Sequence, residues 1–442
     1  MSKRLRLAAL DIGTTKVCCL IGDVSSKGDF EIVGTGVSPN RGLKYGAVVD
    51  IAEVTQAIRS AVASAEEKTN VRVMNCFVNV SGKHLENITN RAVLAISKDQ
   101  GQIQHKDVAT VVDHASRVGI SEDRRILHVT PKGFCVEGIP GIRNPVGLRS
   151  RLVQVDAHII TAEKRPIENI TECLKQADLK FESEGRCVVS SVATSLSALT
   201  DEEKEVGVAL VDIGGGLTDT AVWKDGYLFH TDVHEVGGGL IAYDVATTLR
   251  VPLREAEQLL TDEGLTSRQS QADASSPWST QDTPTVSEPP SEDDPPTIED
   301  RMIQVASLTS QQPQKISVIK LAGVIEARLM DIFDWLNQQF DDLERKGIGP
   351  TTVVLTGGVS QMPGIAQVAE RVLGRGVRIA RPEAIPGLPP SLLLPAFTTA
   401  TGLLYFGIGS LQGKTPPTRT SPLIRFLRQT AEMFAEHLEH FL

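Results

Sequence analysis

Two short segments with the same order of residue types lie about two hundred residues apart in the chain. Asp11 begins the sequence DIGTTK and Asp212 begins DIGGGLTDT, and each aspartate stands between two apolar runs. This pattern predicts two β-hairpins whose turns are rich in glycine. In such a turn several backbone N–H groups can point at one anion. The repeat therefore predicts two phosphate-binding turns, each opening one half of an α/β protein.

The side chains of these turns suit a nucleotide triphosphate with its magnesium ion. Thr14 and Thr15 add hydroxyl donors, and Lys16 adds a positive charge for phosphate. Asp11 and Asp212 stand at strand ends, where they would hold Mg²⁺ through its waters, because Mg²⁺ keeps much of its hydration shell. The alternative is two ordinary tight turns closed by Asp-x-Gly, and the duplication argues against it.

Two glycine pairs in the second half of the chain would complete such a site. Gly357 and Gly358 follow the apolar run VVLT, and the lack of side chains would let a base or ribose lie against the backbone. Gly238 and Gly239, in VGGGLIAYD, open another predicted helix and supply a fourth contact.

The chain has an α/β rhythm with two interruptions. Residues from about 83 to 160 combine one helical pattern, two strand runs and a turn-rich stretch, which predicts a small inserted α+β module. Residues 265–315 are rich in Ser, Thr, Pro and acids, so we expect a disordered loop, with a partner-binding or phosphorylated segment as the alternative. Apolar residues at three- and four-residue steps predict a long helix from Val318 to Phe340.

Composition excludes several classes of function. The chain has 442 residues and a formal net charge of −10, which disfavours nucleic-acid binding through the overall field. Its six cysteines form no C-x-x-C pair, so neither a zinc ribbon nor a redox motif is indicated. His230 and His234 lie in a strand-like run and do not indicate a metal site. No apolar stretch is long enough to span a membrane, and the N-terminal run is too short for a signal peptide.

The end of the chain has an amphipathic pattern. A Gly/Pro/Thr linker at 409–422 precedes residues 423–442, which predict a helix. One side of that helix would carry Ile424, Leu427, Phe434, Leu438 and Phe441, and the other side would carry the charged residues. The charges exclude a spanning helix, so we expect a membrane-targeting helix in the interface plane, with packing on its own domain as the alternative.

Taken in order, these motifs resemble the actin, Hsp70 and sugar-kinase superfamily, whose members hold a nucleotide between two α/β domains. Within it, the chain is similar to the FtsA family of bacterial cell-division proteins. That resemblance rests on RGLKYGAVVDI, NVSGKHLE, ILHVTPKGFCVEG, GIRNPVGL and VDAHIITA, and it covers about 1–260 and 316–408 plus the tail.

The resemblance implies an actin-like (ribonuclease H-like) two-domain α/β fold with an inserted α+β subdomain and a C-terminal amphipathic helix. The implied subdomains are 1A (1–82, 161–201 and 378–408), 1C (83–160), 2A (202–239 and 348–377) and 2B (240–347). The expected nucleotide site comprises Asp11, Gly13, Thr14, Thr15, Lys16, Asp212, Gly214, Gly215, Gly216, Thr218, Gly238, Gly239, Gly357 and Gly358.

The resemblance also implies an adaptor that binds ATP with Mg²⁺, self-associates into filaments and binds the C-terminal tail of the tubulin homologue FtsZ. It would recruit later division proteins through 1C and lie on membrane lipid, at the cytoplasmic face of the inner membrane and at the septum. Tail recognition carries over to 2B, where Arg250, Arg254, Lys320 and Arg328 offer positive charge to an acidic peptide.

Two departures from the family pattern bear on hydrolysis. Leu217 and Ala242 stand where many members have threonine, which implies at most weak ATP hydrolysis. The alternatives are a PilM-like pilus-assembly adaptor and a sugar or acid kinase of the same fold. PilM-like proteins usually end without such a linker and terminal helix, and a kinase would leave that helix unexplained, so neither alternative is favoured.

Overall fold

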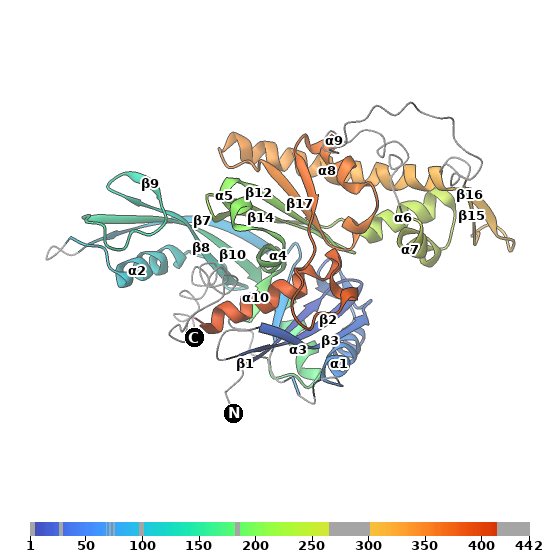
Figure 1. Ribbon diagram of the computed structural model, residues 1–442, viewed down its shortest axis with the longest axis horizontal. Helices are drawn as coiled ribbons and strands as arrows, with labels where there is room; N and C mark the ends of the chain where they lie inside the picture. The colour runs from blue at the N-terminus through green and yellow to red at the C-terminus, as the bar shows by residue number, and fades with distance from the viewer. Residues whose placement is uncertain are drawn as a thin grey trace, which may run out of the picture.

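The structure is a computed structural model, and it describes residues 5–25, 30–67, 69, 72–73, 76–96, 101–181, 186–264 and 301–412. Two domains, each built on a five-stranded sheet, lie one above the other in Figure 1, with a smaller inserted domain to one side. The expectation of a two-domain α/β fold with an α+β insertion is confirmed.

The sheet of the first domain has the strand order β11-β6-β1-β2-β3. Its strands are β1 (Leu5–Ile12), β2 (Lys16–Val24), β3 (Phe30–Pro39), β6 (Phe77–Val80) and β11 (Cys187–Val189). α1 (Ile51–Glu67) and α3 (Lys164–Gln176) cover one face, and α4 (Ser190–Ala198) and α10 (Thr398–Gln412) cover the other. Because both faces are buried, β1 and β2 are almost continuously apolar. A small hairpin of β4 (Leu43–Lys44) and β5 (Ala47–Val48) precedes α1.

The sheet of the second domain repeats this topology in the order β14-β13-β12-β17-β18. Its strands are β12 (Val208–Ile213), β13 (Thr218–Lys224), β14 (Tyr227–His234), β17 (Thr352–Thr356) and β18 (Gly376–Ile379). In both sheets three antiparallel strands form a meander, a fourth strand pairs in parallel with the first of them, and a fifth pairs in parallel with the fourth. The internal repeat of the sequence is thus a repeat of whole sheets. α4 is buried along its length and packs between the two sheets.

The inserted domain interrupts the first domain between β6 and α3. It contains β7 (Leu85–Ala95), α2 (His105–Ser116), β8 (Arg124–Val136), β9 (Ile139–Ile142) and β10 (Leu152–Glu163). Its sheet has the order β7-β10-β8-β9, and α2 packs on it over a core that includes Val111, Phe134 and Val155.

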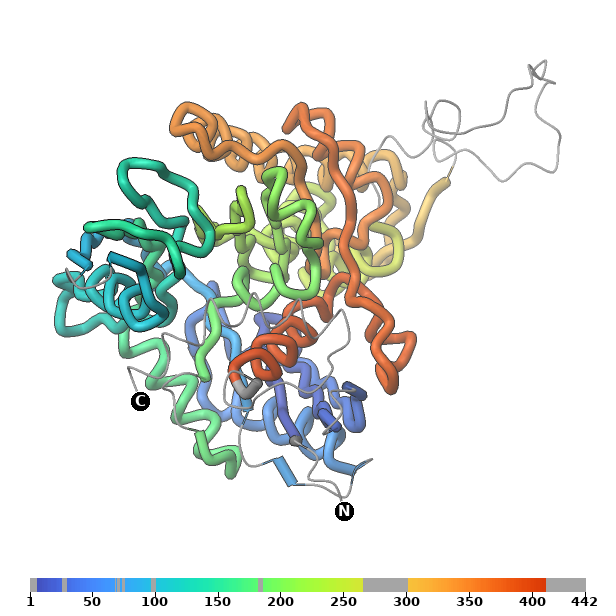
Figure 2. Tube along the Cα trace, turned by 60° about the vertical axis from the view of Figure 1, so that its left-hand side comes forward, coloured from blue at the N-terminus to red at the C-terminus, as the bar shows by residue number. Residues whose placement is uncertain are grey.

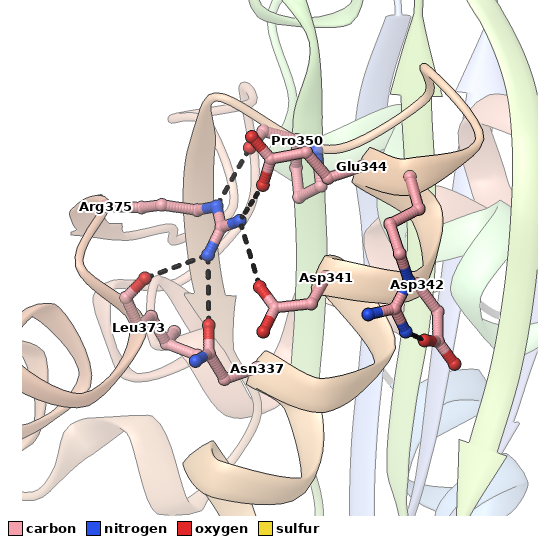
Figure 3. Close-up of polar contacts among 8 residues, drawn as sticks. Asn337, Asp341, Asp342, Glu344, Pro350, Leu373 and Arg375 are labelled. Carbon is pink, nitrogen blue, oxygen red and sulfur yellow. Dashed lines mark hydrogen bonds and ion pairs between the residues drawn. The ribbon is translucent and has the colours of Figure 1, made fainter.

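The helices of the second domain lie partly above its sheet and partly to its right in Figure 1. They are α6 (Gly238–Leu249), α7 (Leu253–Asp262), the predicted long helix α8 (Val318–Arg345) and α9 (Ile365–Leu373), with α5 (Asp201–Val206) at the start of the domain. Three short 3₁₀ turns, at Val359–Gln361, Pro390–Leu392 and Pro395–Phe397, complete the connections to α10. Arg375 fixes the end of α8: its guanidinium donates to Asn337 at 3.0 Å, to Glu344 at 2.9 Å and to the Pro350 carbonyl at 3.0 Å (Figure 3).

The expectation that all of 265–315 is disordered is wrong for its C-terminal part. β15 (Met302–Val305) pairs with β16 (Gln314–Ser317) in an antiparallel hairpin ahead of α8. The physical reason is a small apolar inner face: Val305 and Ile316 are buried in the core shared by α6 and α8. The composition of the segment as a whole is polar, so it does not reveal these few buried apolar side chains. Residues 265–300 lie outside the described part of the chain.

The predicted linker and membrane helix also lie outside the described residues, because the description ends in α10 at Gln412. Within the part that is described, no helix is long and apolar enough to cross a bilayer.

Candidate functional site

The two predicted hairpin turns close in the same way. The Gly13 N–H donates to the Lys16 carbonyl at 2.9 Å, and the Gly214 N–H donates to the Leu217 carbonyl at 2.8 Å. The two turns face one another across the cleft between the domains. A Cβ atom added to Gly215 would lie 2.4 Å from the Thr15 methyl carbon, so only glycine permits this approach.

A cavity of about 100 Å³ lies between the turns. All the residues predicted for the nucleotide site line it, except Thr218, Gly238 and Gly239. The cavity is therefore shared by both turns and by the backbone at Gly357 and Gly358.

Thr218, Gly238 and Gly239 lie behind the second turn. The Thr218 hydroxyl is buried and donates to the Val236 carbonyl at 2.8 Å. The Gly238 and Gly239 N–H groups donate to the carbonyls of Gly214 and Gly215, at 2.9 and 2.7 Å. These residues therefore support the turn from the start of α6 and do not line the cavity.

Three carboxylates line the cavity, and the sequence pattern predicted only two of them. Asp11 and Asp212 end β1 and β12 as predicted, and Asp219 lies directly opposite Asp212 in the β12–β13 hairpin. Asp219 also accepts a hydrogen bond of 2.5 Å from the Ser81 hydroxyl of the first domain. Asp219 is the second aspartate of DIGGGLTDT and follows its glycines, but an acid within a strand pattern does not by itself indicate a place in the site.

Burial dominates the protonation of these acids. Burial raises the pKa of Asp11 to about 6, against the opposing charge of Lys16. Burial and the nearby Asp212 charge raise the pKa of Asp219 to about 8. Burial also raises the pKa of Asp212, although hydrogen bonds from Thr399 and Thr194 work in the other direction. A carboxylate cluster that resists ionisation is one that a bound cation would stabilise in its charged form.

Asp212 is held by residues of the first domain. Its Oδ2 accepts from the Thr399 hydroxyl of α10 at 3.0 Å and from the Thr194 hydroxyl of α4 at 3.2 Å. On the first domain, the Ile12 N–H donates to Asn79 at 2.7 Å, which fixes the end of β1 beside Asp11. Within the described residues no three His, Cys, Asp or Glu side chains converge closely enough to bind an ion directly. The carboxylate oxygens of Asp11, Asp212 and Asp219 fit an ion that keeps its own waters, as Mg²⁺ does.

The third predicted loop joins the same site. Gly357 follows β17 with a φ of +88°, and a Cβ there would lie 2.4 Å from Asp212 Oδ1. Next to it, Gly358 lines the cavity, and a Cβ added there would meet nothing within 4 Å. This open backbone is where a ribose or base could lie.

The residues predicted to bind a partner are spread over the helical part of the second domain. Arg250 directly follows α6, Arg254 is the second residue of α7, and Lys320 lies in the first turn of α8. All three are exposed. Arg328 differs, because it is half-buried and forms ion pairs with Asp244 at 2.6 Å and Asp331 at 3.0 Å. Its charge is already paired with two acids, so it offers less positive charge to a peptide than the other three do.

Two α/β domains of repeated topology, with paired glycine turns facing across a cleft, define an actin-like protein. Solved structures share the fold. The PilM–PilN type IV pilus biogenesis complex contains a chain with a TM-score of 0.61, 16% identity and coverage of 94% of this chain and 100% of that one. MreB5 of Spiroplasma citri bound to ADP gives a TM-score of 0.51 at 12% identity, covering 93% and 99%. At these identities the likeness is one of fold alone.

Sequence comparison is more specific. The family model for cell division protein FtsA matches residues 209–402, and the model for the SHS2 domain inserted in FtsA matches residues 82–161. The FtsA of Pseudomonas aeruginosa is 31% identical over 402 residues, covering 91% of this chain and 89% of that protein. The FtsA of Neisseria meningitidis is 32% identical over 414 residues, covering 93% and 92%. This chain belongs to the FtsA family of cell division proteins.

Proposed function

We propose that this protein is an ATP-binding, self-associating adaptor that tethers FtsZ filaments to the inner face of the cytoplasmic membrane during septum formation. The observation that carries the nucleotide part is the meeting of two glycine turns, Lys16 and three carboxylates in one cleft. Membership of a cell-division family supports the remainder.

The residues of the cleft divide the work of holding Mg-ATP. Backbone N–H groups of the two turns, with Thr14, Thr15 and Lys16, would bind the phosphates. Asp11 and Asp212 would hold the waters of Mg²⁺, and Asp219 would add a third acceptor. When bound, the ion offsets the negative charge of the phosphates and of these acids. The backbone at Gly357 and Gly358 would face the adenosine. ATP hydrolysis is expected to be weak at most, because Leu217 brings no hydroxyl to the second turn.

Titration calorimetry with ATP tests this site. Asp212→Asn keeps the shape of the side chain and an acceptor for Thr399, but removes the charge, so Mg-dependent ATP affinity should fall about tenfold or more. Asp334→Asn, an exposed acid of α8 outside the cavity lining, is the matched control and should bind as the wild type does. Equal affinities for the two variants would exclude the role in holding the ion.

We place the FtsZ tail on the helical part of the second domain. Exposed cations at Arg250, Arg254 and Lys320 lie near large exposed apolar side chains, among them Leu253, Met302 and Ile319. That combination suits an acidic, amphipathic peptide. Charge reversal at Arg250 and Arg254 together should weaken binding of an FtsZ tail peptide and flatten its salt dependence. Arg345→Glu, at the far end of α8, is the control, and an unchanged affinity and salt slope in the double variant would move the site elsewhere.

Membrane attachment is assigned to the tail, through Ile424, Leu427, Phe434, Leu438 and Phe441. Binding of one tail should be weak, because glutamates outnumber arginines in it, and self-association would strengthen it by presenting many tails together. Phe434→Asp with Leu438→Asp should abolish flotation with liposomes while ATP binding persists. Later division proteins would bind the inserted domain.

A further inference from the structure

Each of the two glycine turns has one side toward the other domain and one side toward its own. In both Figure 1 and Figure 2 the dark blue strands of the first domain lie below the green strands of the second domain. Residues 13–15 of the first turn and 214–216 of the second turn line the cavity between them. We call the side of each turn that faces this cavity its front, and the opposite side its back.

The back of the second turn is bonded to the first residues of α6. The N–H groups of Gly238 and Gly239 donate to the carbonyls of Gly214 and Gly215, and neither donor residue lines the cavity. In a trans peptide the N–H points opposite to the C=O, and the described residues contain no cis peptide bond. The N–H groups of Gly215 and Gly216 therefore point to the front.

At the back of the first turn, an asparagine provides the corresponding donors. The Asn40 side-chain nitrogen Nδ2 donates to the Gly13 carbonyl at 2.7 Å, and the Asn40 N–H donates to the Thr15 carbonyl at 3.0 Å. Asn40 is only 2% exposed and does not line the cavity. The Gly13 carbonyl thus points to the back, and the Thr14 N–H, on the same trans peptide, points to the front.

The pairing of β2 with β3 brings Asn40 to this position. The last pair of that ladder joins Lys16 to Pro39, so the next residue after β3 comes level with Thr15. The register of two strands therefore delivers the side chain of Asn40 to the turn, although it lies 27 positions away from Gly13 in the sequence.

A further bond fixes which way the Asn40 amide faces. Its oxygen Oδ1 accepts from the Gly42 N–H at 3.1 Å. A flipped amide would set oxygen against the Gly13 carbonyl and nitrogen against the Gly42 N–H, and both bonds would be lost. The position thus requires a donor and an acceptor on one planar group. An ionised aspartate has the same shape but can only accept.

We propose that Asn40 is a positioning residue of the first turn, and that it directs the Thr14 N–H at the phosphate of a bound nucleotide. Asn40 does not touch the phosphate and acts through the peptide between Gly13 and Thr14. It does for the first turn what the start of α6 does for the second. The phosphate part of this inference rests on the proposed function, whereas the direction of the peptide rests on the bonds given above.

Two substitutions at this position and one control test the proposal by titration calorimetry with Mg-ATP. Asn40→Ala removes the donor without adding charge, and Asn40→Asp keeps the shape but sets an oxygen against the Gly13 carbonyl. Both should weaken binding about tenfold or more, the value of one hydrogen bond to a charged group. Asn90→Ala removes an equivalent bond of 2.8 Å to the Ala115 carbonyl, inside the inserted domain, and should bind as the wild type does.

Amide NMR separates the direction of one peptide from a general loosening of the site. In protein labelled with ¹⁵N-threonine and ¹⁵N-glycine, saturating Mg-ATP should move the amide signals of Thr14, Gly215 and Gly216 downfield, because each N–H donates to phosphate. In Asn40→Ala only the Thr14 shift should be lost, and Asn40→Asp replaces that variant if it does not fold. A Thr14 signal that does not move in the wild type, or that moves equally in the variant, would overturn the proposal. So would the loss of all three shifts together.

Inorganic triphosphate separates this inference from the nucleotide proposal, because it carries the phosphates without adenosine. It should move the same three amide signals in the wild type. If triphosphate does so, the variant loses only the Thr14 shift and ATP does not bind, then the role of Asn40 stands and the nucleotide proposal fails. Equal ATP affinity in Asn40→Ala and Asn90→Ala would refute the role of Asn40 alone. Binding of neither probe to the wild type would overturn both.

Discussion

Ser81, which follows β6 in the first domain, donates a hydrogen bond of 2.5 Å to Asp219 of the second domain. The bond crosses the cleft beside the candidate phosphate turns and joins residues that are 138 positions apart in the sequence. Asp219 is buried, and its pKa is raised to about 8. Near neutral pH it is therefore largely protonated, and its charge appears only at higher pH or beside a cation.

The first prediction concerns stability in the absence of nucleotide. The native pKa of Asp219 is about 8, whereas an unfolded aspartate titrates near 4. The native state thus retains a proton that the unfolded state loses, so this stabilisation is complete below about pH 4 and is lost as pH rises through 8. Asp219→Asn should remove that loss. Urea denaturation should find the variant more stable than the wild type at pH 9, with a smaller difference at pH 5. Parallel stabilities across that range would contradict the raised pKa.

The second prediction concerns protons released when Mg-ATP binds. A cation near the three carboxylates favours their ionised forms, and with a pKa of about 8 Asp219 still carries a proton at pH 7. Binding should release about one proton per ATP, and affinity should rise with pH between 6 and 8. Calorimetry in two buffers of different ionisation enthalpy measures the release. Asp219→Asn serves as the control and should release almost none.

The third prediction concerns the backbone at the end of β17. Gly357 has a φ of +88°, and a Cβ there would lie 2.4 Å from both Asp212 Oδ1 and the Ile213 carbonyl oxygen. Gly357→Ala should therefore lower the free energy of unfolding by about 1–3 kcal/mol or more, and it should also weaken ATP binding by displacing Asp212. Gly376, at the start of β18, has open space around it, so Gly376→Ala should change stability by less than about 0.5 kcal/mol. Similar losses in both variants would show that the close approach to Asp212 does not matter.

Local patterns in the sequence were sufficient to predict the parts of the site that lie within one hairpin. Asp11, Asp212 and the two glycine turns are such parts, because the strand–turn–strand pattern fixes where each residue stands. The bonds of Thr194 and Thr399 to Asp212 come from helices that meet only after both sheets have formed. Nothing in the spacing of these threonines indicates that contact. Asp219 lay between these cases: its place in the strand was predictable, but its burial beside two other acids was not.

The β15–β16 hairpin ahead of α8 shows that the average composition of a segment can conceal a short ordered element within it. The polar, proline-rich composition predicts disorder over all of 265–315, yet Val305 is only 2% exposed and Ile316 only 7% in the core beneath α6 and α8.

Replacing 268–298 by a short Gly/Ser linker should change stability by less than about 1 kcal/mol, because loop-closure entropy varies slowly with length. Replacing 268–312 removes β15 as well, so the buried side chain of Val305 is lost and Ile316 is uncovered. That variant should be less stable by about 2 kcal/mol or more, from the apolar area returned to water. Urea denaturation of both variants against the wild type measures the difference, and equal stability of the two would show that β15 does not contribute to the core.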